Sequence, residues 1–227
     1  MLLGVGGVRA RGSHAWSYTR RLRLAKLLDT DSVRGLLGLF LADGRLEQVR
    51  APVRPRISAI IEGGTGETDF LEEKVAELRR FLPTRAQIRQ YQTSQRESGN
   101  RTTVLRFRVH GQKLRPIYNL LYPYGRRQIT SPALELLGGR AAAWLWAEGA
   151  KPLESGGFML RRVGYEEDEA LLLSSWLRML TGAESELCTL YQSPRLLYGA
   201  DQAALLQTSL LPYAPLSRRQ LFLPPLP

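Results

Sequence analysis

The sequence has too few cysteines and histidines to build the sites that these residues usually form. Cys188 is the single cysteine among 227 residues, so no disulfide can form within the chain. His14 and His110 are the two histidines, and with one cysteine they leave no zinc cluster. Any bound metal must therefore be a hard cation held by oxygen atoms.

A long apolar run is also missing. Residues 1–8 contain too many glycines for a signal or membrane helix, and Arg9 and Arg11 follow this segment rather than precede it. We therefore expect an intracellular protein, in a bacterial cytoplasm or an organelle, that is not secreted and does not bind membranes. Residues 1–30 are expected to form a basic N-terminal extension that is partly flexible.

Acidic residues are too few to balance the basic ones. The chain has 32 Lys and Arg against 21 Asp and Glu, a net charge of +11 that predicts attraction to polyanions. Residues 1–125 hold 22 basic and 11 acidic residues, whereas residues 126–227 hold 10 of each. The whole surplus lies in the first half, although a basic ribosomal or membrane-surface protein would have a similar total charge.

The segment 35–44 reads as a short apolar helix with small residues on one face. Gly35, Gly38 and Ala42 are spaced by three and four residues, which places them on a stripe that another backbone can approach closely. Asp43 ends the helix, and Gly44 is expected to stop it in the left-handed conformation. A bound cation would offset the repulsion between Asp43 and the negative end of the helix dipole.

A second segment, 141–149, aligns with residues 36–44 without a gap. In this alignment the small residues Ala143 and Ala147 match Gly38 and Ala42, and Glu148–Gly149 matches Asp43–Gly44. The two acids are 105 residues apart, by 148 − 43, in a chain of 227 residues. Two such helix ends at this separation indicate an internal duplication.

The two segments resemble the signature helices of the LAGLIDADG homing endonucleases, in the branch of group I intron-encoded endonucleases and maturases with two motifs in one chain. In that family the two helices pack at a pseudo-twofold axis. The resemblance implies an α+β fold of duplicated αββαββα halves, residues 31–125 and 126–227. Their two antiparallel four-stranded sheets would form a saddle over the nucleic acid.

Hydrophobic periodicity gives a compatible order of elements in each half. In the first half it predicts strands at 45–50 and 56–62, a helix at 69–82, strands at 85–91 and 102–110, and a helix at 113–122. In the second half it predicts a strand at 157–163, a helix at 166–180 that Gly182 ends, strands at 186–192 and 195–198, and a closing helix at 200–211.

The first-half strands carry Arg, Gln, Tyr and His on one face, with almost no acid to balance them. Arg can read guanine and Gln can read adenine in the major groove, while other arginines hold phosphates. An antiparallel sheet that is simply hydrated on one side would alternate in the same way. The second-half strands are poorer in charge. The predicted nucleic-acid-binding residues are Arg54, Arg56, Arg85, Gln87, Arg89, Tyr91, Arg106, Arg108, Lys113, Arg126 and Arg162.

The family resemblance also implies a reaction, the metal-assisted hydrolysis of phosphodiester bonds in double-stranded DNA by a monomer. The acids that end the two helices, Asp43 and Glu148, would ligate Mg²⁺, with Mn²⁺ as an alternative. Arg127 would neutralise charge on the phosphates but cannot act as a base. The residues implied at the helix interface are Gly35, Gly38, Ala42, Ala143 and Ala147.

Three departures from the family pattern favour a different function. Glu148 replaces the usual Asp. Arg126 and Arg127 occupy the position of a basic pair that in relatives includes an active-site Lys. Arg218 and Arg219 lie near the position where relatives have a second active-site Lys. The alternative is a non-cleaving nucleic-acid-binding protein, either an intron maturase or RNA-splicing factor acting on intron RNA, or a domesticated DNA-binding protein. An unrelated basic ribosome-associated protein is a third hypothesis.

Overall fold

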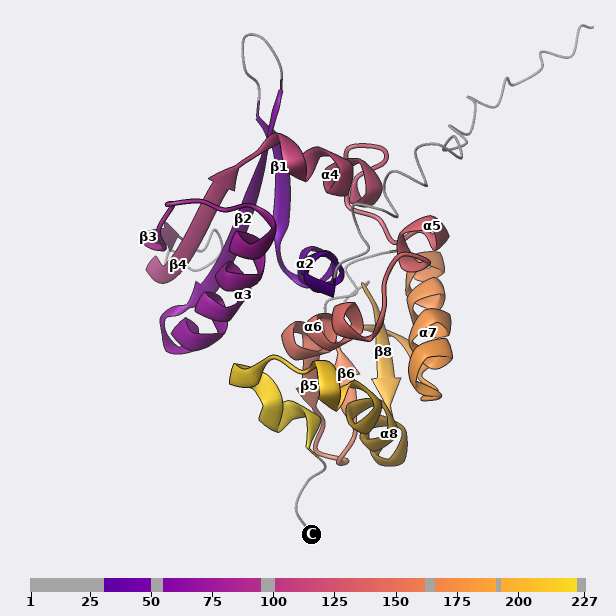
Figure 1. Ribbon diagram of the computed structural model, residues 1–227. Coiled ribbons are helices and arrows are strands. Elements are labelled where there is room, and N and C mark those ends of the chain that lie inside the picture. The colour runs from indigo at the N-terminus through magenta and orange to yellow at the C-terminus, as the bar shows by residue number, and fades with distance from the viewer. Residues whose placement is uncertain (1–30, 50–54, 95–100, 162–165, 191–192, 224–227) are drawn as a thin grey trace, which may run out of the picture.

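The computed structural model describes residues 31–49, 55–94, 101–161, 166–190 and 193–223 (Figure 1). The expectations for residues 1–30, Arg54 and Arg162 concern residues outside these ranges. Within the described ranges, every helix is too short or too polar to span a bilayer.

The α+β fold class predicted from the sequence is confirmed. Each half contributes one four-stranded antiparallel sheet, and the strand order β1-β2-β4-β3 of the first sheet recurs as β5-β6-β8-β7 in the second. The repeated order is the arrangement expected of a duplicated unit. The strands are β1 (Arg45–Val49), β2 (Arg56–Gly64), β3 (Arg89–Ser94), β4 (Arg101–His110), β5 (Ala150–Pro152), β6 (Phe158–Leu160), β7 (Glu186–Leu190) and β8 (Ser193–Tyr198).

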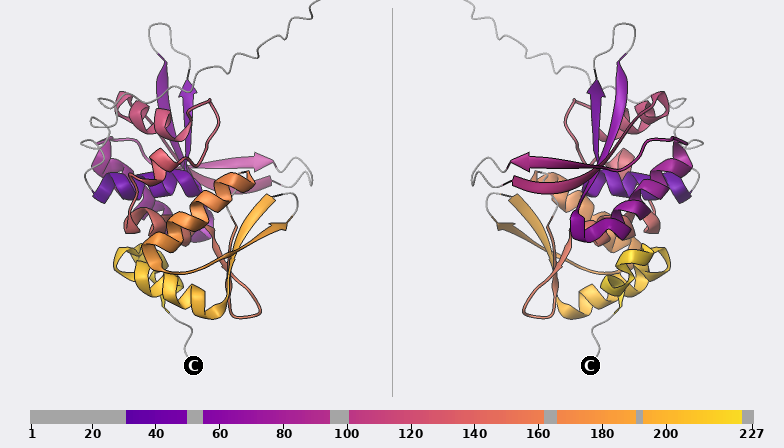
Figure 2. Two further views of the ribbon diagram at one scale, coloured as in Figure 1. Left: turned by 90° about the vertical axis from the view of Figure 1, so that its right-hand side faces the viewer. Right: turned by 90° about the vertical axis from the view of Figure 1, so that its left-hand side faces the viewer.

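Two central helices, α2 (Asp31–Ala42) and α6 (Gly139–Gly149), lie side by side between the sheets (Figure 1). The other helices pack against the apolar faces of the sheets and against one another, and Figure 2 shows the same arrangement from two further sides. They are α3 (Thr68–Phe81), α4 (Arg115–Leu121), α5 (Ser131–Leu134), α7 (Glu167–Thr181) and α8 (Ala200–Leu210), with 3-10 turns η1 (Thr65–Glu67), η2 (Gln112–Leu114), η3 (Leu211–Tyr213) and η4 (Leu216–Phe222).

The backbones of α2 and α6 touch at Gly38. A Cβ atom at Gly38 would lie 2.2 Å from the carbonyl oxygen of Ala141 and 2.6 Å from its Cα, which no side chain could tolerate. Gly35 faces the flexible side chain of Arg140 instead, at 3.0 Å from its Nε. The residue opposite Gly38 is therefore Ala141, and not Ala143, which aligns with Gly38 in the sequence repeat. The remaining predicted interface residues, Ala42, Ala143 and Ala147, are buried.

The expected left-handed conformation at Gly44 was wrong, because the glycines with positive φ are Gly125, Gly156 and Gly182 among the described residues. A glycine is required at position 44 because there is no room for a side chain. Its amide donates to the carbonyl of Leu39 at 2.9 Å, and a Cβ there would lie 2.6 Å from the Phe40 ring. Gly182 ends α7, as the sequence predicted, and does so in the left-handed conformation with φ of 76°.

Several strands are shorter than the periodicity predicted. β3 begins at Arg89, not at residue 85, because the segment after α3 is tied back to that helix by a bond of 2.8 Å from Arg79 to the Ala86 carbonyl. β6 is shorter than the predicted strand at 157–163, and β5 was not predicted; each has three residues, too few to show an alternating pattern.

Candidate active site and nucleic-acid interface

The two acids that end the central helices converge on a single ammonium group. Lys74 Nζ lies 3.9 Å from Asp43 Oδ2 and forms an ion pair with Glu148 Oε1. Asp43 follows α2 and Glu148 is in the last turn of α6, so the close crossing of these helices at Gly38 brings both carboxylates to one place. The structure thus brings together the two acids that the sequence selected as metal ligands.

Lys74 is the residue of this site that sequence reasoning missed. It lies on α3, its side chain is 3% exposed, and Nζ is 4.4 Å from the centre of the Phe70 ring. A signal was present, because Lys74 follows Phe70 by four residues and precedes Val75 on the buried face of an amphipathic helix. A lysine at such a position needs a buried acidic partner.

Burial governs the electrostatics of the acid pair. The Glu148 side chain is 7% exposed, and desolvation raises its pKa more than the adjacent Lys74 ammonium lowers it. Glu67 raises the pKa further and Arg218 lowers it, both from a greater distance. The Asp43 side chain is 24% exposed and is therefore the more accessible of the two carboxylates.

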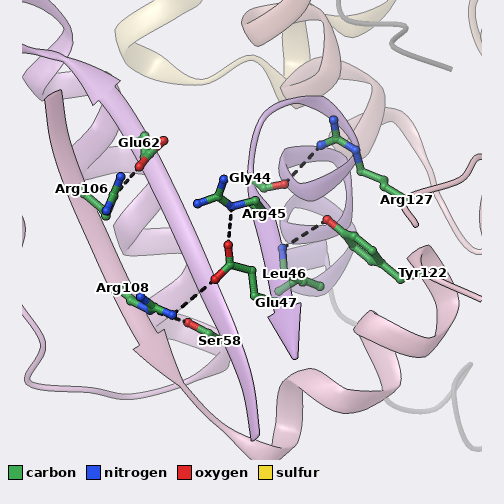
Figure 3. Close-up of polar contacts among 10 residues, drawn as sticks. All are labelled: Gly44, Arg45, Leu46, Glu47, Ser58, Glu62, Arg106, Arg108, Tyr122 and Arg127. Carbon is green, nitrogen blue, oxygen red and sulfur yellow. Dashed lines mark hydrogen bonds and ion pairs between the residues drawn. The ribbon is translucent and has the colours of Figure 1, made fainter. Parts of the chain in front are cut away.

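Arg127 lies at the end of α2, beside Asp43. Its Nη1 donates to the carbonyl of Phe40 at 3.1 Å and to that of Gly44 at 3.3 Å, and Figure 3 shows the contact with Gly44. A cation at this end of a helix offsets the negative end of the dipole. Arg127 therefore stabilises the turn that positions Asp43.

The outward face of the first sheet is defined by the strand register. Arg45 is opposite Ile60 and Ile60 is opposite Arg108, while Glu62 is opposite Arg106, which is opposite Arg89. Directly opposed residues project to the same side of a sheet. This face carries Arg45, Glu47, Arg56, Ser58, Ile60, Glu62, Arg89, Tyr91, Arg106, Arg108 and His110.

Two glutamates balance part of the positive charge of this face, which corrects the prediction that almost no acid lies there. Glu47 pairs with Arg45 at 2.9 Å and with Arg108 at 3.3 Å, and Glu62 pairs with Arg106 (Figure 3). These glutamates come from β1 and β2, so the alternation of β3 and β4 alone did not reveal them. Among the described residues the face still has five arginines and two glutamates, a net charge of +3.

The ion pairs also hold the central arginines in fixed orientations. Arg108 Nε donates to Ser58 Oγ at 2.9 Å, in addition to its pair with Glu47 (Figure 3). The Arg106 guanidinium lies 4.7 Å from the centre of the Tyr91 ring. Guanidinium groups held this way lose less conformational entropy when they bind a ligand.

Four other residues predicted to bind nucleic acid lie off this face. Arg85 and Gln87 precede β3, and Gln87 lines a hollow beside α3 together with Glu72 and Arg79. The remaining two are Lys113, which is exposed in the turn η2, and Arg126, which pairs with Glu166 at 2.9 Å before α7.

The corresponding face of the second sheet is far less polar, as the sequence predicted. Lys151 is opposite Met159, which is opposite Leu197, and Leu197 is opposite Glu186. Cys188 and Leu190 of β7 lie on the same side, opposite Arg195 and Ser193. The two cations and one acid among these described residues give a net charge of +1.

The donor set of the acid pair fits a hard divalent cation, because both groups are carboxylates and positive charge already lies between them. Asp43 and Glu148 would hold the ion. In the part of the chain that the structure describes, no cluster of three or more His, Cys, Asp and Glu residues could hold a metal. Further ligands would have to be water or substrate oxygens, as Mg²⁺ commonly uses.

The fold is shared with solved nucleases. The structure of the homing endonuclease I-WcaI bound to its DNA recognition sequence matches with a TM-score of 0.72 and 12% identity, over 95% of this chain and 96% of that one. I-DmoI in complex with DNA and Mn matches with a TM-score of 0.53 and 15% identity, over 79% of this chain and 96% of that one.

An I-DmoI variant in complex with its target DNA in the presence of Mg matches with a TM-score of 0.55 and 14% identity, over 82% of this chain and 98% of that one. No protein-family model and no curated protein match the sequence. The structural matches span nearly the whole length of these nucleases, and the same paired helices were identified from the motif residues. The chain has the fold of the LAGLIDADG homing endonucleases.

Proposed function

We propose that this protein is a monomeric, site-specific DNA endonuclease that hydrolyses phosphodiester bonds with Mg²⁺ or Mn²⁺. The observation that carries the proposal is the convergence of Asp43 and Glu148, from two helix ends, on one cationic group. Structural neighbours bound to DNA, with Mg or Mn, support the same class of substrate and cofactor.

The roles of the residues follow from their positions. Asp43 and Glu148 would hold the divalent ion, which when bound activates water and stabilises the leaving oxygen. Arg127 fixes the turn that carries Asp43, through its bonds to the carbonyls of Phe40 and Gly44. The acids immediately precede β1 and β5, so DNA lying on the sheets would pass close to them.

The first sheet would supply most of the contacts to DNA. Arg106 and Arg108 are buttressed by Glu62, Glu47 and Ser58, which leaves them oriented for bidentate contact with guanine edges. Arg89 lies directly opposite Arg106 and has no ion pair among the described residues, and it would hold a phosphate.

The proposal is tested by nicking of a plasmid that carries the target site. The target is sought first as the intron-free insertion site, if the gene lies inside an intron. Purified protein with Mg²⁺ or Mn²⁺ should nick or linearise the plasmid, and EDTA should stop the reaction. DNA binding without any nicking in either metal would contradict the nuclease.

Removing three arginines of the first sheet should weaken DNA binding strongly. We expect the combined change of Arg89, Arg106 and Arg108 to Ala to lower affinity and to reduce the salt dependence by roughly one counterion for each phosphate that is no longer bound. The measurement is fluorescence anisotropy over a series of salt concentrations. The control replaces Lys151 and Arg195 of the second sheet, and equal reductions in affinity from both sheets would contradict the asymmetry.

A non-cleaving nucleic-acid-binding protein is the second candidate, and Lys74 favours it. Its ammonium already neutralises part of the charge of Asp43 and Glu148, so the two acids can lie together without a metal. An intron maturase or splicing factor acting on RNA, or a domesticated DNA-binding protein, would bind nucleic acid without a metal between these two acids.

The change Glu148→Asp separates the two candidates. The shorter side chain withdraws from the Lys74 ammonium, so nicking should rise, by on the order of tenfold if about 1.4 kcal/mol of the pairing energy is removed. Initial rates of plasmid nicking at subsaturating Mg²⁺, where the rate depends on metal affinity, measure this. If wild type and variant both bind DNA or intron RNA and neither nicks, the binding protein is the correct description.

A further inference from the structure

The position of Lys74 is unusual for a lysine. Its side chain is 3% exposed, and its nitrogen is held between a carboxylate from each half of the chain. A buried ammonium requires compensating negative charge, and the two acids supply it. Lys74 itself comes from α3, so a helix of the first half reaches the acid of the second half.

Side-chain contacts on both sides of Lys74 join α3 to α6. Phe70 stacks on Trp144 with ring centres 5.8 Å apart, and Glu77 pairs with Arg140. On the other side, Glu73 accepts bonds from the amides of Leu216 at 2.8 Å and Ser217 at 3.1 Å, which ties η4 to the same helix. The backbone of residue 74 is thus fixed, so any displacement of the ammonium must come from rotation about the bonds of its four-carbon side chain.

The other charged groups near this site do not replace Lys74. The Arg218 guanidinium lies 4.5 Å from the centre of the Phe70 ring and is paired with Glu67. A divalent cation would satisfy both carboxylates more fully than a single ammonium does.

We propose that Lys74 is a built-in counter-ion that occupies the cation position between Asp43 and Glu148, and that a divalent metal must displace its ammonium to bind. The inference rests on the proposed metal-dependent function. Lys74 is then the positioning residue that sets the affinity for metal. In the absence of metal it keeps the two acids together and the crossing of α2 and α6 intact.

Metal binding without DNA tests the inference directly. Isothermal titration with Mn²⁺ should give at least tenfold tighter binding to Lys74→Met than to the wild type, because the competing ammonium is gone. The control Arg80→Met removes one exposed positive charge from the same helix and should leave the affinity unchanged. Adding Asp43→Asn to Lys74→Met should abolish the gain, which locates the binding at this site.

A second measurement uses the wild-type protein, so it does not depend on how the variant folds. An amine-acylating reagent should leave Lys74 unmodified in EDTA because its side chain is buried. Saturating Mn²⁺ should increase acylation of Lys74 severalfold, while Lys113, which is exposed, should react equally in both conditions. Peptide mass spectrometry reports both residues in one sample.

Two results would contradict the inference, and they have different consequences for the proposed nuclease activity. If Mn²⁺ binds wild type as tightly as Lys74→Met, or if Lys74 stays protected with the metal bound, Lys74 does not compete and the nuclease proposal still stands. If neither protein binds Mn²⁺ in the absence of DNA, this inference is wrong, whereas metal-dependent cleavage, in which substrate oxygens complete the site, is decided by the plasmid assay.

Discussion

The change Asp43→Asn should abolish Mg²⁺-dependent nicking and leave DNA binding unchanged or stronger. Asn keeps the shape of the side chain but removes the negative charge that would hold the metal. Loss of several kcal/mol of metal-assisted stabilisation corresponds to a fall of about 10²-fold or more in the nicking rate. Binding improves because a carboxylate that no metal screens repels the phosphates. Plasmid nicking and anisotropy on the same preparation measure the two effects.

The matched control for this experiment is Asp201→Asn. Asp201 is an exposed acid in the first turn of α8, in the second half, and its removal changes the net charge by the same amount. The Asp201→Asn variant should nick the plasmid at the wild-type rate. A variant at Asp43 that still cleaves as fast as wild type would show that this carboxylate does not hold the metal.

The change Gly38→Ala should destabilise the fold, and Gly38→Leu should do so more strongly. The added Cβ would lie 2.2 Å from a backbone oxygen of α6, so the two helices must separate. We expect a decrease of about 1–3 kcal/mol in the free energy of unfolding, toward the upper end because the neighbour is backbone and cannot rotate away. Urea unfolding followed by circular dichroism measures it.

Two other glycines provide the comparison. A Cβ at Gly66 meets nothing within 4 Å, so Gly66→Ala should be close to neutral. Gly35→Ala should fall between them, because the nearest atom, 3.0 Å away, belongs to the flexible side chain of Arg140. If Gly38→Ala unfolds at the same urea concentration as Gly66→Ala, the helix crossing does not depend on the absence of a side chain at position 38.

The fold could be predicted from the sequence because its main signals are local or repeated. The gapless match of residues 36–44 with 141–149 placed two equivalent helices in the chain. Period-two alternation identified strand β4, and Gly182 marked the end of α7. Each of these depends on residues that are neighbours along the chain, where spacing alone sets the side of a helix or strand on which a side chain lies.

Predictions failed where contacts between distant segments decide the outcome. The segment 85–88 alternates like a strand, but Arg79 ties it to α3. The acids of the first sheet come from β1 and β2, and only the strand register places them beside Arg106 and Arg108. Gly44 is required by the lack of space beside Phe40, a packing constraint that a sequence pattern does not express.

The sequence by itself determined the two acids, the two small-residue helices that carry them, and the unequal distribution of charge between the halves. Only the tertiary structure decided what lies between those acids. Lys74 reaches them because α3 packs on α6 through Phe70 and Trp144, which are 74 residues apart by 144 − 70. Burial of apolar surface drives that packing and does not depend on sequence separation. The position of Lys74, which lies on the same helix as Phe70, therefore follows only from the tertiary structure.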